Sequence, residues 1–254
     1  MKRTIIVFLA IGLILALGTV AMATNQAPGT GITRTSHDLS SITGVGDSWG
    51  SGSAADGTMD RICIYCHTPH HSATAVDATA KGLTYYPLWN HDTTVLTYET
   101  YTNGLDTPDG IQHSLNAAPL GQPGSVSKLC LSCHDGSVAI SSYGNYEGGA
   151  NSESHTGAVN ASGRILVGGS VFGLTNHHPI GFVYADVQAA DDEINDVTTP
   201  FTNNPFGITI EEVLWKGKME CSSCHDVHNT KNSGSKFTWT EDTNSQLCLT
   251  CHYK

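Results

Sequence analysis

The sequence has little positive charge and little of the apolar material from which an ordinary core is built. Lysine and arginine together number 12, against 23 aspartates and glutamates, so the formal charge is −11. This balance argues against nucleic acid as a partner, because phosphate binding needs a basic surface. Hydrophobic residues are only 39% of the chain, whereas glycine occupies 27 positions. A chain of this kind needs another source of stability, and its cysteines are the candidate.

Long apolar runs are absent after the first residues, so no membrane span is expected in the body of the chain. The exception is the run from Ile5 to Val20, which follows two basic residues and precedes Ala21-Met22-Ala23. This order is typical of an export signal, so we expect a signal peptide over residues 1–23. A retained membrane anchor is the alternative, although the run is short for a spanning helix. Residues 24–254 are expected to form a single domain.

Little regular secondary structure is expected, because no long stretch keeps a helical or a strand period. The exceptions are Ser125 to His134 and Thr243 to His252, each of which predicts one or two helical turns. The acidic run from Asp186 to Asp196 is expected to be a solvated surface segment. A domain without regular structure is unusual unless a rigid group other than side chains fills its core.

All eight cysteines fall into four Cys-x-x-Cys-His motifs, and none is left over. This spacing is that of covalent haem attachment, in which two thiols bind one haem and the adjacent histidine ligates its iron. The sequence therefore predicts four haem c groups in a mostly irregular multihaem c-type cytochrome fold, with short helices at the motifs, little sheet and a haem-filled core. The predicted residues are Cys63, Cys66 and His67; Cys130, Cys133 and His134; Cys221, Cys224 and His225; and Cys248, Cys251 and His252.

Three other uses of the cysteines fit the motifs less well. Disulfides suit an exported chain, but they do not require a histidine after every second cysteine. Zinc held by paired Cys-x-x-Cys knuckles also leaves the four histidines unexplained. A thioredoxin-like redox pair needs one such motif in a strand–helix unit, not four. Haem attachment is the reading that uses every cysteine and its neighbouring histidine.

Of the 13 histidines, four belong to the motifs, which leaves nine. We expect four of these nine to be distal ligands, so that every iron has two imidazoles. A six-coordinate iron has no open position for a substrate, and the predicted function is electron transfer without enzymatic activity. A multihaem reductase would instead need one five-coordinate haem, often with an unusual proximal ligand.

The placement of three histidines favours them as distal ligands. His70 and His228 lie three residues after His67 and His225, near the same face of the turn, so neither can reach the far side of its own haem. Each would therefore serve a different iron. His178 precedes a proline, which fixes the chain beside the imidazole. On chemistry alone, the fourth distal ligand stays open between His37 and His91.

The sequence resembles multihaem cytochromes with paired Cys-x-x-Cys-His motifs. More closely, it is similar to the tetrahaem subunits of extracellular cytochrome nanowires, the outer-surface cytochrome E type. Under this resemblance His37, His70, His178 and His228 are the distal ligands, and His91 has no assigned role. The resembling pieces, which extend over most of residues 24–254, are His37-Asp38-Leu39-Ser40, Cys66-His67-Thr68-Pro69-His70, Pro87-Leu88-Trp89-Asn90, Leu131-Ser132-Cys133-His134-Asp135-Gly136, His178-Pro179, Cys224-His225-Asp226-Val227-His228 and Leu247-Cys248-Leu249-Thr250-Cys251-His252.

The resemblance implies a secreted, head-to-tail filament of identical subunits on or outside the cell surface. Periplasmic or outer-membrane cytochromes would supply its electrons, and extracellular acceptors would receive them. One distal histidine would cross to the neighbouring subunit, and we expect a neighbour's His70 to complete the fourth haem, because only two residues follow His252. The alternatives are a soluble periplasmic tetrahaem shuttle and, less favoured, a multihaem reductase.

Overall fold

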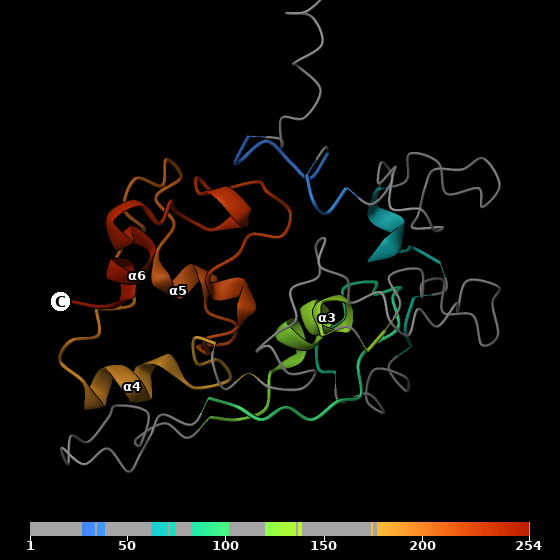
Figure 1. Ribbon diagram of the computed structural model, residues 1–254, viewed down its shortest axis with the longest axis horizontal. Helices are drawn as coiled ribbons and strands as arrows, with labels where there is room; N and C mark the ends of the chain where they lie inside the picture. The colour runs from blue at the N-terminus through green and yellow to red at the C-terminus, as the bar shows by residue number, and fades with distance from the viewer. Residues whose placement is uncertain are drawn as a thin grey trace, which may run out of the picture.

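The computed structural model describes residues 27–33, 35–38, 62–70, 72–74, 83–101, 120–135, 137–138, 174 and 177–253 (Figure 1). The predicted signal peptide, residues 1–23, lies outside these ranges. Within them the regular structure consists of short helices and isolated β-bridges, without a strand. The helices are η2 (Ile62–Tyr65), α3 (Ser125–His134), α4 (Tyr184–Ala190), α5 (Ile210–Val213), η4 (Cys221–Ser223), η5 (Ser235–Phe237), η6 (Thr243–Ser245) and α6 (Gln246–Cys251).

The predicted fold class, mostly irregular with short helices at the motifs and little sheet, is confirmed over the described residues. Helix α3 has the predicted bounds, and the predicted helix at the C-terminal motif is formed by η6 and α6 in succession. In the first, third and fourth motifs, the histidine amide donates to the carbonyl of the first cysteine at 2.7, 3.2 and 3.0 Å. That bond closes one helical turn and brings the two thiols and the imidazole of a motif together.

Helix α4 forms the first part of the acidic run from Asp186 to Asp196, where no helix was expected. The run does lie at the surface, and Asp186 is exposed, but its first part belongs to a helix that begins at Tyr184. Tyr184 and Val187, one turn apart, are both buried against the C-terminal half of the chain. The apolar spacing of these two residues stabilises the helix beneath the acidic surface.

Among the described residues, the apolar core is divided into four small clusters. The largest contains Phe182, Ile210 and Met219 and contacts Cys251 of the fourth motif. A second contains Trp89 and contacts Cys66 of the first motif. The other two pack around Leu131 of α3 and around Phe201, beside Leu247 of α6. Each cluster thus supports one part of the motif framework, and none of them would stabilise a chain of this length alone.

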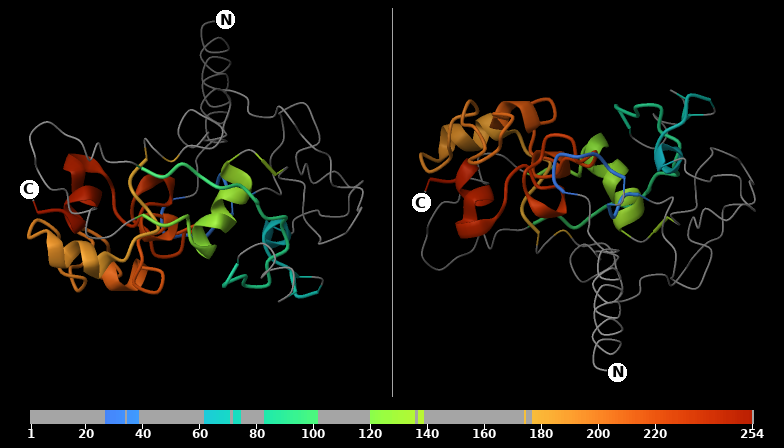
Figure 2. Two further views of the ribbon diagram at one scale, coloured as in Figure 1. Left: turned by 90° about the horizontal axis from the view of Figure 1, so that it is seen from below. Right: turned by 90° about the horizontal axis from the view of Figure 1, so that it is seen from above.

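Segments far apart in the sequence hold the framework together. Residues 27–38 lie against the loop after the third motif (Figure 2). There the amide of Gly31 donates to the carbonyl of Asn229 at 2.6 Å, and the side-chain amide of Asn229 donates to the carbonyls of Ala27 and Gly31 at 3.0 and 2.7 Å.

No helix in the described part of the chain is long and apolar enough to cross a bilayer.

Gly181 is a tight point of the fold, and its replacement tests this packing. Its φ is +84°, and an added Cβ would lie 2.9 Å from the carbonyl oxygen of Gly121. We expect Gly181→Ala to lower the free energy of unfolding by about 2–4 kcal/mol, from the left-handed backbone and the clash together. Gly207→Ala is the matched control, because Gly207 has a φ of +65° and nothing within 4 Å. Equal losses in denaturant unfolding would contradict the packing account.

Candidate functional site

Three of the four motif histidines lie beside a second histidine from a distant part of the chain. The ring centroids of His67 and His228 are 6.2 Å apart, and those of His252 and His178 are also 6.2 Å apart. His134 of α3 lies 6.0 Å from His37 by the same measure. In each pair one member is a predicted proximal ligand and the other a predicted distal ligand.

This spacing fits two imidazoles on one metal ion. A metal–imidazole bond is about 2.0 Å long and the ring centroid lies about 1.1 Å behind the nitrogen, so two imidazoles on opposite sides of one metal have centroids roughly 6 Å apart. The interplanar angles of 32°, 56° and 64° are compatible with this arrangement, because each ring can rotate about its metal bond. The residues of these motifs would therefore hold a haem by two thiols and ligate its iron with two imidazoles.

Backbone carbonyls fix the tautomer of several of these rings. A hydrogen bond from Nδ1 to a carbonyl places the ring proton there and leaves the Nε2 lone pair for a metal. Burial lowers the pKa of His37, and the nearby His225 and His228 act in the same direction, which favours the neutral form that ligates metal. The hydrogen bonds from Nδ1 to a backbone carbonyl join His67 to Pro87 at 2.6 Å, His178 to Pro179 at 2.9 Å, His225 to Lys236 at 3.0 Å and His37 to Val227 at 3.4 Å.

A buried aspartate holds the loop that carries His225 and His228. Asp226 accepts hydrogen bonds from the backbone amides of His228, Thr230 and Lys231 at 3.1, 2.8 and 2.8 Å. Burial alone would raise the pKa of Asp226, but these bonds hold it below its ordinary value. The carboxylate therefore stays ionised and orients the loop that carries the two candidate ligands.

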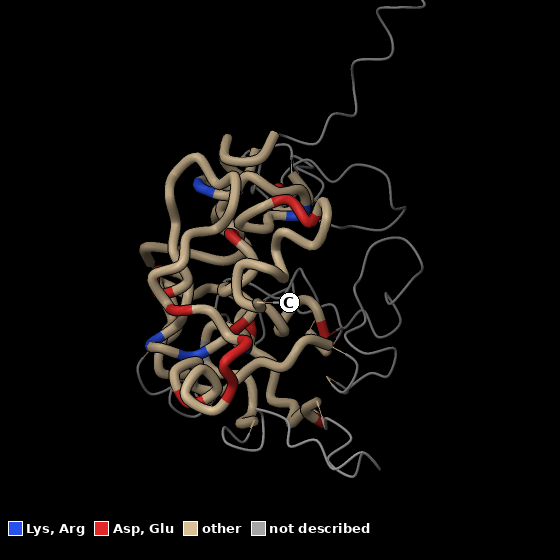
Figure 3. Tube along the Cα trace, turned by 90° about the vertical axis from the view of Figure 1, so that its left-hand side faces the viewer, with Lys and Arg blue, Asp and Glu red and all other residues tan. Residues whose placement is uncertain are grey.

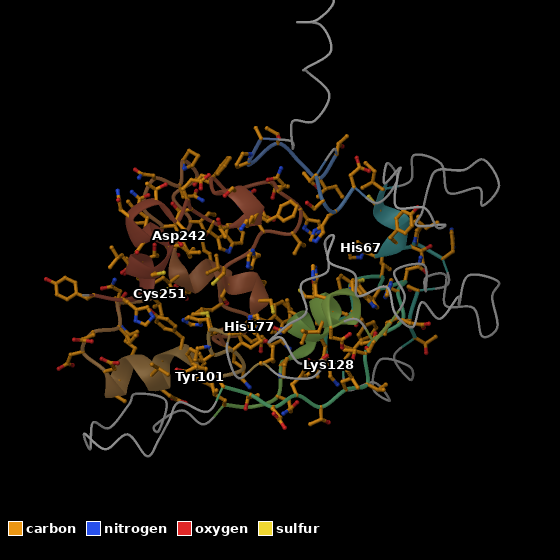
Figure 4. All side chains as sticks on the ribbon, viewed as in Figure 1. His67, Tyr101, Lys128, His177, Asp242 and Cys251 are labelled. Atoms are coloured by element: carbon orange, nitrogen blue, oxygen red, sulfur yellow. The ribbon has the colours of Figure 1, made fainter. Side chains whose placement is uncertain are left out.

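The cysteines give the order of the motifs in space. The thiols of Cys130 and Cys221 are hydrogen-bonded to each other, and Cys66 lies close enough to Cys130 to interact with it electrostatically. Cys224 is similarly close to Cys251. These neighbours connect the first motif with the second, the second with the third and the third with the fourth, and Figure 4 shows the first and the fourth, marked by His67 and Cys251, at opposite sides of the described chain.

The thiols do not resemble a disulfide framework or a zinc site. All eight cysteines are free. Burial raises the pKa of Cys66 to about 11 and that of Cys224 to about 12, so both thiols are protonated when no group is attached to them. Across the described ranges, no three histidine, cysteine, aspartate or glutamate side chains gather as they would around a bare metal ion.

The third motif differs from the other three. His225 is exposed, and in the described part of the chain no other histidine ring is paired with it. The predicted ligand His70 is also exposed and is not paired with a histidine ring within the described ranges. The structure thus brings together His37, His178 and His228 with motif histidines, and it leaves His70 at the surface.

His91 is the residue that chemistry left as the rival of His37 and that the resemblance did not place. It is only 5% exposed, and its Nε2 atom lies 3.5 Å from the Sγ atom of Cys133. Its Nδ1 atom is bonded to the carbonyl of Asp92 at 2.7 Å, as in the histidines that carry a lone pair on Nε2. The feature of the sequence that marks His91 is the preceding Trp89-Asn90. In the structure both of these residues are buried, and Trp89 forms a β-bridge to His67, so they hold His91 near the first motif.

Comparison with known proteins identifies the C-terminal part of the chain. Residues 215–254 match a family model described as a doubled CXXCH motif. This stretch contains the third and fourth motifs, including His225 and His252. No curated protein and no solved structure matches the chain.

The pairing of His178 with His252 leads to a direct test. We expect His178→Ala to leave one iron per chain without its sixth ligand, because these two rings have the spacing of a shared metal. The oxidised variant should show a new high-spin ferric signal in paramagnetic resonance, and its reduced form should bind carbon monoxide.

His177→Ala is the matched control, since it changes the adjacent histidine of the same segment. The control should keep the parent spectrum. If both variants keep a fully low-spin spectrum, His178 is not an iron ligand.

Proposed function

We propose that this multihaem c-type cytochrome, whose class follows from its motifs and from the match to the doubled CXXCH family, transfers electrons through four covalently bound haems. The observation that carries the proposal is the 6.0–6.2 Å spacing of the three histidine pairs. An iron between two imidazoles exchanges electrons and offers no position for a substrate. We therefore propose a carrier and not an enzyme.

The order of the motifs supports a continuous path. Thiol neighbours connect the first motif to the second, the second to the third and the third to the fourth. Haems attached to these cysteines would form one row, with the first and fourth motifs at its two sides. Such a row can accept an electron at one side of the subunit and release it at the other.

Within the described residues, no second histidine ring lies beside His225 of the third motif, and this supports assembly into a filament. His70 cannot reach its own iron, and both His70 and His225 are exposed. We propose that His70 of one subunit completes the third iron of the next. This revises the expectation for the fourth haem, because His178 already lies beside His252. A contact between two different surfaces is head-to-tail and, where it does not close into a ring, builds an open filament.

The acidic surface bears on location and partners. Figure 3 shows aspartate and glutamate along much of the described chain, with few lysines and arginines. Together with the sequence pattern of an export signal, this suits a secreted, extracellular protein whose surface attracts cationic partners and metal ions. In the proposed filament, periplasmic or outer-membrane cytochromes donate electrons and extracellular acceptors receive them.

His91 supports a second candidate function, that of a soluble periplasmic shuttle. It is buried beside Cys133 of the second motif, and Cys130 of that motif contacts the third motif through Cys221. If His91 ligates the third iron within the same chain, every iron is satisfied without a neighbour. His70 would then have no role, and the subunit would stay a monomer.

Paired variants separate the two functions. We expect His70→Ala to give no filaments, or short ones, in negative-stain microscopy and one altered haem per chain, whereas His91→Ala should still polymerise. The His70→Ala subunit keeps an open third motif but cannot extend the chain. Adding it to the parent protein should therefore shorten parent filaments in proportion to its share.

The opposite pattern would establish the shuttle. Parent protein that is monomeric in microscopy, with an altered haem in His91→Ala and none in His70→Ala, would exclude the crossing ligand.

A further inference from the structure

A buried carboxylate joins the second and third motifs. Glu220 immediately precedes Cys221, and its side chain is only 1% exposed. The backbone amide of Gly124, at the start of α3, donates to its two oxygens at 3.2 and 3.1 Å. The hydroxyl of Ser127, in the first turn of α3, also donates to it. This carboxylate therefore caps the helix that carries the second motif.

The same serine connects back to the third motif. The amide of Cys221 donates to the Ser127 oxygen at 3.0 Å, so Glu220, Cys221 and Ser127 form a closed set of bonds. The amide of Glu220 in turn donates to the hydroxyl of Ser223 at 3.0 Å. Gly124 leaves room for this arrangement, because a Cβ at that position would overlap the Glu220 carboxylate.

Burying a carboxylate is costly in free energy unless it is paired and hydrogen-bonded, and an apolar residue would avoid this cost. Burial raises the pKa of Glu220, while the bonds from Ser127 and Gly124 and the positive charge of Lys218 oppose the rise. The polar and charged groups that interact with Glu220 are thus Ser127 on α3, Lys218 on the preceding loop and Cys221 and Ser223 on η4. Lys218 is the one cation among these neighbours.

We infer that Glu220 is a positioning residue for electron transfer, which fixes the second motif against the third and places a negative charge beside both. Helix α3, which carries Cys130, contacts η4, which begins at Cys221 directly after Glu220, so the groups attached to these two motifs are neighbours. The inference rests on the proposed function, since the groups it positions are haems. One side chain would then set the relative position of the second and third haems.

The negative charge has a predictable effect on potential. A nearby carboxylate stabilises the ferric form of a haem over the ferrous form, which carries one positive charge less. The effect is large where solvent is excluded, and burial is one of the levers that set haem potential. Removing the charge should therefore raise the potentials of two haems and leave the other two unchanged.

The test compares three variants of the haem-loaded protein. Glu220→Gln removes the charge, Ser127→Ala removes the bridging hydroxyl but keeps the charge, and Glu212→Gln changes an exposed glutamate that caps α5. Potentiometric titration reports the haem potentials. The Soret circular dichroism couplet, which arises from adjacent haems, reports their relative orientation.

We expect Glu220→Gln to raise two of the four midpoint potentials and to weaken the Soret couplet. Ser127→Ala should weaken the couplet with a smaller change in potential, and Glu212→Gln should match the parent protein. If Glu220→Gln does not accumulate, the couplet of Ser127→Ala decides. If the first two variants keep the potentials and the couplet of the parent protein, the inference about Glu220 is wrong but the proposed function still holds. A parent protein without haem would overturn the inference together with the proposed function.

Discussion

The spacing between paired imidazoles is the constraint on which the rest of this structure depends. Three motif histidines lie 6.0–6.2 Å from a second histidine, measured between ring centroids, and that is the separation set by one shared metal ion. A metal bonded on both sides links segments that have little apolar contact with each other. In the proposed cytochrome, covalent and coordinate bonds to the haems would supply the larger cohesion, and the four small clusters of side chains would orient the motifs.

Buried polar groups take over the role that sheets and long helices have in other folds. Glu220 caps α3 from the third motif, and Asp226 gathers three amides around the loop between two candidate ligands. Such groups are costly to bury without partners, and both are fully engaged. They fix the orientation of the motif segments where the backbone is irregular. A row of closely spaced haems requires each motif to have a precise orientation.

The helices at the motifs could be predicted from the sequence, but which distal histidine lies beside which motif histidine could not. The motif spacing and the short apolar pattern gave the bounds of α3, because both signals are contained within ten residues. The pairing of His134 with His37 depends on contacts between residues 27–38 and the loop after the third motif, which no local pattern encodes. The missing role of His91 has the same cause. Helix α4 was missed because charge dominated the apolar spacing of Tyr184 and Val187.

The central claim is that paired imidazoles hold every iron of the assembled protein. Near-infrared magnetic circular dichroism, normalised to iron and to chain, tests it most directly, because the energy of the ferric charge-transfer band identifies the two axial ligands. The account predicts four haem irons per chain, all low-spin with two imidazoles. A high-spin haem, a methionine-ligated haem or a chain without haem iron would contradict it.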